Sequence, residues 1–200
     1  MDLFNNDVTS NLLPFDGEVS YTPALLSTSE AQHFLNALVH EIAWQQDSIR
    51  IFGKTHITKR KVAWYGDRAF VYRYSNTEKV ALPWTPTLLQ LKQLVEQETG
   101  FVFNSCLLNL YHDGTEGMSW HADDEKPLGE QPTIASLSLG AARKFSFKHK
   151  STKQSVSILL ENGSLLLMRG ETQANWLHAL PKMAKVKGMR VNLTFRRISD

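Results

Sequence analysis

The sequence predicts a mostly β protein of the α+β class, with a helical N-terminal layer packed on a β-sandwich. Before Gly100, two stretches carry apolar residues at helical spacing. After Gly100, short runs rich in β-branched and aromatic residues alternate with turn residues. Many short strands at fairly regular spacing favour a sandwich or barrel over a parallel sheet. The expected strands lie at 101–111, 133–139, 143–149, 155–160, 164–168, 175–180 and 189–198.

Each predicted helix has its own start or stop signal. Ser27-Thr28-Ser29-Glu30 offers a capping box, and the apolar residues that follow it at helical spacing are Phe34, Leu35, Leu38 and Ile42. The second helix covers residues 86–99 and ends at Gly100. Residues 49–75, rich in aromatic and basic side chains, are expected to form strands and loops. Residues 1–27 are polar and are expected to form an extended arm, which leaves 28–200 as a single domain.

Length and composition set further bounds. A chain of 200 residues with 42% hydrophobic residues is large enough for one domain with its own core. Cys106 is the only cysteine, so an intramolecular disulfide framework and a cysteine-based metal site are excluded. The first residues lack the basic and apolar regions of a signal peptide, and no run of 18 apolar residues occurs. We therefore expect a cytoplasmic protein with no membrane partner. A monomer is also expected, although no sequence feature reports the oligomeric state.

Charge is distributed unevenly, although the formal net charge is only +2. Residues 143–197 hold 12 Lys and Arg against two acids, a balance of +10, whereas residues 1–142 hold 10 against 17, a balance of −7. Basic surface concentrated in one stretch suits a polyanionic partner such as nucleic acid. A solvated basic face without a partner is the alternative reading of the charge alone.

A candidate metal site is spread over two distant segments. His121 and Asp123 stand two residues apart in Ser119-Trp120-His121-Ala122-Asp123, a spacing that puts both side chains on one face of a strand. His178 follows 55 residues later. Two histidines and one carboxylate on one face of a metal leave open positions for substrate and oxygen, as in non-haem iron(II) oxygenases. Zinc would accept the same ligands, usually in a closed or hydrolytic site.

The last predicted strand offers a binding site for an organic acid. The polar side chains that share one of its faces are Arg190, Asn192, Thr194 and Arg196. Arginines inside a sandwich need anionic partners, and a dicarboxylate would supply two. On the strand at 107–111, Asn109 and Tyr111 share a face and could donate to the same acid. A surface strand with a basic fringe is the alternative.

Over roughly residues 50–198 the sequence resembles the AlkB family of oxidative nucleic-acid dealkylases, and within it the branch with the human DNA-repair homologues. The order and spacing of several motifs together carry the resemblance. The motifs are Asn109-Leu110-Tyr111-His112-Asp113-Gly114, His121-Ala122-Asp123-Asp124-Glu125, Ile134-Ala135-Ser136-Leu137-Ser138-Leu139-Gly140-Ala141, Gly163-Ser164-Leu165-Leu166-Leu167-Met168-Arg169-Gly170, Trp176-Leu177-His178-Ala179-Leu180-Pro181 and Arg190-Val191-Asn192-Leu193-Thr194-Phe195-Arg196.

This resemblance implies a double-stranded β-helix (jelly-roll) core over residues 101–198 and a nucleotide-recognition lid over 49–82. The residues that match the family's iron ligands are His121, Asp123 and His178. Arg190 matches the arginine that pairs with the distal carboxylate of 2-oxoglutarate, and Arg196 matches a second arginine near the metal-proximal carboxylate. The residues that match others lining this co-substrate are Asn109, Tyr111 and Asn192.

The resemblance also implies contacts with nucleic acid. Asp124 and Glu125 match acidic residues near an extruded base. Phe52 falls where duplex-repair relatives carry a wedge that fills the gap left by that base. The lid residues expected to approach the base or its phosphates are Arg60, Tyr72 and Tyr74. A core position beside Ile51 is the alternative for Phe52.

The function implied is oxidative repair of N-alkylated bases, such as 1-methyladenine and 3-methylcytosine, in DNA, with RNA as a further substrate. Fe(II), O2 and 2-oxoglutarate would be consumed, and succinate, CO2 and formaldehyde released. The alternatives are an oxygenase that hydroxylates or demethylates RNA or protein, an oxygenase acting on a small molecule, a zinc hydrolase, and a non-catalytic nucleic-acid-binding module. A zinc hydrolase would have no need of Arg190 and Arg196, and the basic balance argues against protein or small-molecule substrates.

Overall fold

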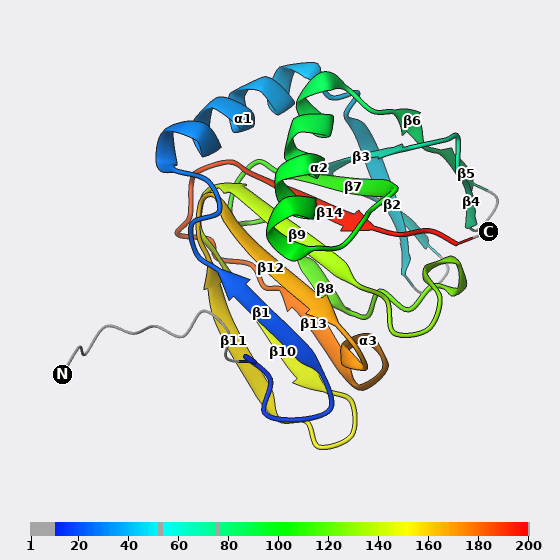
Figure 1. The fold of residues 1–200 in the computed structure, drawn as a ribbon, viewed down its shortest axis with the longest axis vertical. Coiled ribbons are helices and arrows are strands. Elements are labelled where there is room, and N and C mark those ends of the chain that lie inside the picture. Colours follow the sequence, from blue (N-terminus) through cyan, green and yellow to red (C-terminus); the bar gives the residue numbers. More distant parts are fainter. Residues whose placement is uncertain (1–10, 52–53, 75–76, 200) are drawn as a thin grey trace.

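The computed structural model describes residues 11–51, 54–74 and 77–199. Figure 1 shows helices on one side of a large sheet and a smaller sheet on the other. The elements are β1 (Glu18–Thr22), α1 (Thr28–Glu41), β2 (Gln45–Ile51), β3 (Lys54–Gly66), β4 (Val71–Tyr74), β5 (Thr77–Val80), β6 (Leu82–Pro83), α2 (Pro86–Thr99), β7 (Ser105–Tyr111), β8 (Met118–His121), η1 (Lys126–Leu128), β9 (Ile134–Gly140), β10 (Arg143–His149), β11 (Ser155–Leu160), β12 (Ser164–Arg169), α3 (Thr172–Asn175), β13 (Trp176–Leu180) and β14 (Arg190–Arg196).

Two antiparallel sheets form the sandwich. The major sheet has the order β1-β12-β9-β14-β7-β3-β2, with β6 pairing in parallel beside β3. The minor sheet has the order β11-β10-β13-β8, and β4 and β5 form a separate two-stranded sheet. Apart from the consecutive pairs β2–β3 and β10–β11, neighbouring strands of the two sheets are not consecutive in sequence, as expected of the predicted jelly-roll core. The predicted mostly β class is confirmed.

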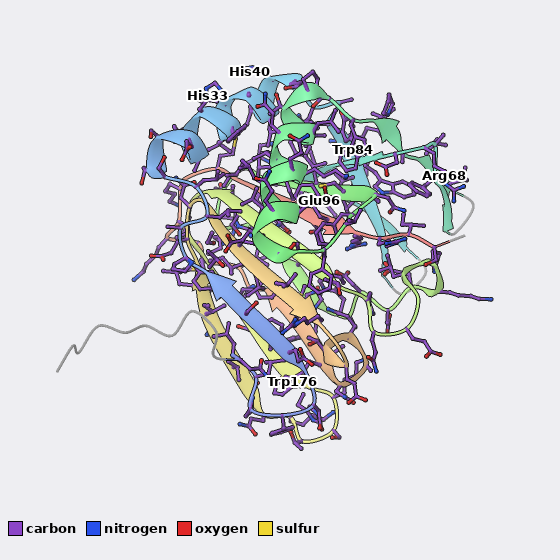
Figure 2. The ribbon with its side chains drawn as sticks, viewed as in Figure 1. His33, His40, Arg68, Trp84, Glu96 and Trp176 are labelled. Atoms are coloured by element: carbon purple, nitrogen blue, oxygen red, sulfur yellow. The ribbon has the colours of Figure 1, made fainter. Side chains whose placement is uncertain are left out.

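The two long helices, α1 and α2, form where the sequence predicted them, whereas the short helices η1 and α3 were not predicted. In α1, Ser27 and Glu30 make the reciprocal capping-box bonds. Helix α2 begins with a bond from the Leu88 N–H to the Thr85 hydroxyl, and it ends at Gly100, whose φ of +73° favours glycine. Figure 2 shows His33 and His40 on the outward side of α1.

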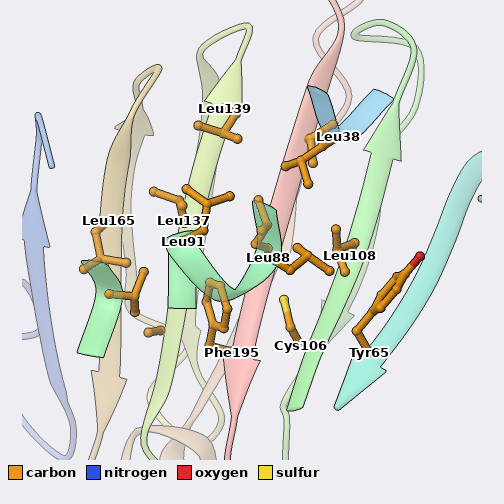
Figure 3. Close-up of a cluster of buried hydrophobic side chains, with 14 of the residues drawn as sticks. Leu38, Tyr65, Leu88, Leu91, Cys106, Leu108, Leu137, Leu139, Leu165 and Phe195 are labelled. Atoms are coloured by element: carbon orange, nitrogen blue, oxygen red, sulfur yellow. The ribbon is translucent and has the colours of Figure 1, made fainter. Parts of the chain in front are cut away.

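The apolar faces of α1 and α2 bury the outer face of the major sheet. Figure 3 shows Leu88 and Leu91 of α2 over the strands, beside Phe195 of β14 and Leu137 of β9. A second core fills the space between the two sheets, with Phe147 and Trp176 among its largest members. Strand β14 contacts both regions, because its apolar residues face the helices and its polar residues face the minor sheet. The predicted alternation along this strand is therefore confirmed.

The segment before α1 corrects one prediction. Residues 18–22 form β1, which pairs with β12 from Glu18 opposite Arg169 to Thr22 opposite Leu165. Within the same segment Leu13, Val19 and Leu26 are buried. The description of residues 1–27 as an arm outside the domain is therefore wrong for residues 11–27, and residues 1–10 lie outside the described part. Strand β1 is held in the sheet by backbone pairing with β12, which is distant in sequence. Local composition cannot predict such a contact.

The predicted lid is only partly separate from the core. Over Lys61–Gly66, strand β3 pairs with β7 inside the major sheet, while β4 and β5 stand apart as a hairpin. Among the described residues, no helix has the length and apolar character needed to cross a membrane.

Candidate metal and co-substrate site

The two histidines of the predicted metal site lie opposite each other on neighbouring strands. His121, the last residue of β8, pairs with His178 of β13, and the centroids of their rings are 4.2 Å apart. Their Nε2 atoms lie 3.9 Å (His121) and 4.0 Å (His178) from carboxylate oxygens of Asp123. The three candidate ligand atoms all lie within 4.8 Å of one another, close enough to share one ion.

Asp123 reaches this site from a loop. We expected His121 and Asp123 on one strand face, but β8 ends at His121, so that placement is wrong for Asp123. The Asp123 N–H donates to Oε1 of the buried Gln173 at 2.9 Å, and Nη2 of Arg196 donates to Oδ1 of Asp123 at 2.9 Å. These two contacts hold the carboxylate beside the histidines.

A backbone carbonyl of β8 sets the orientation of the His121 ring. Its Nδ1 lies 2.8 Å from the carbonyl oxygen of Ser119. A carbonyl oxygen only accepts, so Nδ1 carries the proton and Nε2 presents its lone pair to the site. The backbone of β8 thereby selects the tautomer that can bind a metal.

Electrostatics put both buried ligands in the protonation state that a metal requires. Burial by itself would raise the pKa of Asp123, but the charge of Arg196, with the two histidines, outweighs burial and lowers it. Burial lowers the pKa of His178 to about 4, against the attraction of Asp123. At neutral pH the site therefore offers a carboxylate and a neutral imidazole.

A cavity of about 240 Å³ between the sheets adjoins the three candidate ligands. Strand β14 lies between β7 and β9, so Arg190 stands opposite Tyr111, and Asn192 stands opposite Asn109 and Ser138. The structure places every predicted co-substrate residue in the lining of this cavity. They are Asn109, Tyr111, Arg190, Asn192 and Arg196.

Arg190 is the most deeply buried arginine among the predicted co-substrate residues. It is 2% exposed, Nη2 donates to the Ser138 hydroxyl at 2.9 Å, and the guanidinium lies 5.6 Å from the centre of the Tyr111 ring. Burial lowers the pKa of Arg190 to about 10, and among the described residues no carboxylate pairs with it. A buried guanidinium without a counter-ion fits a carboxylate ligand.

The residues present thus fit both Fe(II) and 2-oxoglutarate. Two imidazoles and a carboxylate supply the metal ligands, with space beside them for further ligands. The Nε atoms of Arg190 and Arg196 are buried and have no partner among the described residues, so a dicarboxylate in the cavity would meet donors at both ends.

Comparison with known proteins agrees with this geometry. A model of the 2OG-Fe(II) oxygenase superfamily matches residues 18–196, from β1 to the end of β14. The chain belongs to this superfamily. The matched residues include the three candidate ligands and the whole polar face of β14, so the predicted cofactor, Fe(II), and co-substrate, 2-oxoglutarate, are confirmed for this oxygenase.

The relatives include AlkB homologues, which confirms the predicted family. Alpha-ketoglutarate-dependent dioxygenase alkB homolog 3 of Rattus norvegicus is 39% identical over 186 residues, which cover 88% of this chain and 62% of that protein. DNA oxidative demethylase ALKBH2 of Homo sapiens is 38% identical over 192 residues, which cover 90% of this chain and 73% of that protein. The chain thus spans less than two thirds of the rat relative.

One solved structure shows the same fold at low identity. The structure of OsALKBH1 has a TM-score of 0.66 and 15% identity, with 90% of this chain and 97% of that chain covered. At this identity the likeness concerns the fold alone.

Some residues of the site were not predicted. Ser136 and Ser138 of β9 accept hydrogen bonds from Asn192 and Arg190, at 2.8 and 2.9 Å, and so position the co-substrate face. The alternation of serine with apolar residues at 134–139 could have indicated them. Gln173 lies in a four-residue helix, and no local pattern distinguishes it.

Of the predicted substrate residues, some line the metal cavity, one lies outside it, and the others belong to the lid. Arg60 is buried, lines the metal cavity and donates from Nη1 to Sδ of Met118 at 3.2 Å, which places it deeper than the phosphate contact we expected. Glu125 also lines this cavity. Asp124 is exposed, lies 3.7 Å from the Lys150 ammonium, and does not line the cavity.

The remaining lid residues were predicted from resemblance. Tyr72 and Tyr74 occupy alternate positions of β4, opposite Lys79 and Thr77. Phe52 lies outside the described residues, so its role as a wedge stays a prediction.

A second cavity, of about 440 Å³, adjoins the first. The residues that line both are Leu107, Glu125 and Arg196. Its wall includes Trp64 and Phe70, whose rings stack at 6.4 Å, and Arg68 lies 4.8 Å from the centre of the Phe70 ring. Figure 2 shows Arg68 on the side of the molecule where β4 lies. The metal site therefore adjoins a second cavity with an aromatic wall, which we call the aromatic chamber.

Proposed function

We propose that this oxygenase removes alkyl groups from N-alkylated bases in DNA, such as 1-methyladenine and 3-methylcytosine. The reaction would consume O2 and 2-oxoglutarate and release succinate, CO2 and formaldehyde. The printed name of the human relative, DNA oxidative demethylase, supports this proposal. So does the basic balance of +10 over residues 143–197, which suits a polyanionic substrate.

The observation that carries the proposal is the position of Glu125. This half-buried residue lines both cavities, and its Oε2 atom is buried and has no hydrogen-bond partner among the described residues. A buried carboxylate oxygen without a partner favours a cationic or hydrogen-bond-donating ligand. 1-Methyladenine and 3-methylcytosine are cationic, unlike the normal bases, so Glu125 would select the damaged base by charge.

The chamber whose wall includes Trp64 and Phe70 suits the extruded base. Its volume of about 440 Å³ falls in the range of small-molecule sites, and its aromatic wall matches the planar face of a base. A base in this chamber would have its edge at the shared residues Leu107, Glu125 and Arg196, next to the metal ligands. Methylated bases that cannot pair are also less costly to extrude, which adds selectivity.

The residues of the chain position the reactants. Fe(II), once bound, would supply oxygen activation coupled to decarboxylation of 2-oxoglutarate, and the hydroxylated alkyl group then leaves as formaldehyde. Arg190 binds and orients the dicarboxylate, with Ser138 behind it. Arg196 holds Asp123 through a hydrogen bond, and Arg196 also lines the second cavity. The apolar neighbours limit the entry of water.

The test measures formaldehyde and the mass of the repaired strand. Oligonucleotides carry 1-methyladenine, 3-methylcytosine or no lesion, in DNA and in RNA, with Fe(II) and 2-oxoglutarate. We expect metal-dependent repair of the alkylated DNA strands. Succinate formation without repair of any strand would contradict the proposal and favour a protein substrate.

A matched pair of variants tests Glu125. Glu125→Gln should lower repair of cationic 1-methyladenine by tenfold or more relative to neutral 3-methylthymine, on the order of one charge-assisted contact. Asp124→Asn removes the adjacent charge outside the cavity and should leave this ratio unchanged. Equal ratios in the two variants would remove Glu125 from substrate selection.

A further inference from the structure

The outer face of the minor sheet carries an arrangement that the metal site does not use. Alternation along β10 turns Phe145 and Phe147 into the core, so Lys144 and Lys148 lie on the opposite face. The other residues that alternate onto this outer face are Ser146 of β10, Ser155, Ser157 and Leu159 of β11, and Leu177 and Ala179 of β13. None of them is acidic.

Trp120 of β8 is the aromatic member of this surface. It is 41% exposed, and the Nζ atom of Lys148 lies 4.3 Å from the centre of its ring. Tryptophan is the largest apolar side chain and is highly buried on average, so a ring that is 41% exposed offers a large apolar face to a partner. We call Trp120 with Lys144, Lys148 and Lys150 the Trp120 surface.

The Trp120 surface borders the metal site. Trp120 immediately precedes His121, and Lys150 pairs with Asp124, the residue that follows Asp123. Lys150 also donates to the carbonyl oxygen of Gln173 at 2.9 Å, the residue whose side chain fixes Asp123. None of the four residues of the Trp120 surface lines either cavity, so this surface lies outside the site, next to the loop that carries Asp123.

We propose that the Trp120 surface binds single-stranded nucleic acid beside the target nucleotide, an inference that rests on the proposed function. An indole stacks on any unstacked base, and the ammonium groups of Lys144 and Lys148 contact backbone phosphates, which together are the features of sequence-independent single-strand binding. Lys150 is held by Asp124 and the Gln173 carbonyl oxygen and adds only its positive charge nearby. Bases inside a duplex are already stacked on each other and cannot use Trp120. The surface therefore favours single strands.

Binding measured apart from turnover tests this inference. Fluorescence anisotropy gives the dissociation constant of the 200-residue chain, loaded with Mn(II) and 2-oxoglutarate, for an unmodified 15-nucleotide oligothymidine. Trp120→Ala should weaken binding about fivefold or more, the loss expected for one stacked base. Trp120→Phe keeps a stacking ring and should retain most of the affinity. Lys148→Gln should reduce the slope of log K against log salt by about 0.7.

Controls separate the surface from the metal site and from net charge. Lys92→Gln removes one positive charge from α2, on the far side of the major sheet, and should leave the salt slope unchanged. Binding of a matched duplex should respond little to Trp120→Ala. Fe(II)-dependent succinate formation without nucleic acid should also be unchanged in this variant, which would show an intact metal site.

The outcomes distinguish this inference from the proposed function. Unchanged oligothymidine affinity in Trp120→Ala overturns the Trp120 surface even if alkylated DNA is repaired. Loss of affinity in this variant supports the surface even if the wild type repairs no lesion. Equal losses on single strand and duplex, or equal slopes for Lys148→Gln and Lys92→Gln, would also contradict it and return the face to a solvent-exposed or protein-contacting role.

Discussion

Arg196 donates a hydrogen bond of 2.9 Å from Nη2 to Oδ1 of Asp123, a residue 73 positions earlier in the chain. The contact joins the last strand of the major sheet to the loop after β8, and it links the co-substrate face to the metal ligands. Because both residues are largely buried, it also fixes the charge of the carboxylate.

Arg196→Lys should weaken binding of Mn(II) or Fe(II) by about 10- to 100-fold, as for other residues that orient a metal ligand. The lysine keeps the positive charge but loses the hydrogen bond to Oδ1, so the pKa of Asp123 should rise and protons should compete with the metal at higher pH than in the wild type. Calorimetric metal titration at several pH values measures both effects. Arg197→Lys, at the exposed neighbouring position, is the control, and equal behaviour of the two variants would contradict this role.

Arg190→Lys keeps the positive charge but loses the planar fork, so 2-oxoglutarate should bind tenfold or more weakly. Ser138→Ala removes only the hydroxyl that accepts from Arg190, and a loss of about two- to tenfold is expected. Titration of 2-oxoglutarate into the Mn(II)-loaded protein gives both dissociation constants. Unchanged affinity in Arg190→Lys would reassign this arginine to a purely structural role.

The metal-free protein should lose stability as the pH falls from about 6.5 to about 4. Burial lowers the pKa of His178 to about 4, so over this interval His178 is protonated in the unfolded chain and neutral in the folded chain. The loss ends below pH 4 and amounts to on the order of 3 kcal/mol. Urea unfolding of the chelator-treated wild type and of His178→Gln measures it, because the variant lacks this titration. Identical pH dependence in both proteins would show that His178 is not buried as a neutral group.

Phe52→Ala should reduce repair of a lesion in duplex much more than repair of the same lesion in a single strand. A wedge offsets part of an unstacking cost of a few kcal/mol, and single strands have no such cost. Repair rates on matched substrates make the comparison internal, since a general folding defect would lower both rates. Equal losses would place Phe52 in the core.

The local sequence determined the two long helices and the polar face of the last strand. Helix α2 ends at Gly100 because glycine adopts a positive φ at little cost, and β14 alternates because successive side chains of a strand point to opposite faces. These are effects of neighbouring residues. The sequence also showed the types and the order of the candidate ligands. It therefore predicted the metal triad His121, Asp123 and His178 and the arginine pair Arg190 and Arg196.

Only the tertiary structure decided the contacts between distant segments. It placed residues 18–22 in the major sheet, put His178 opposite His121, and brought Gln173 to Asp123. It also separated the two acids that follow Asp123. Glu125 lines both cavities, whereas Asp124 lies outside them beside the Lys150 ammonium. Neighbours in sequence point in different directions once a loop leaves its strand, and the packing of both sheets sets those directions.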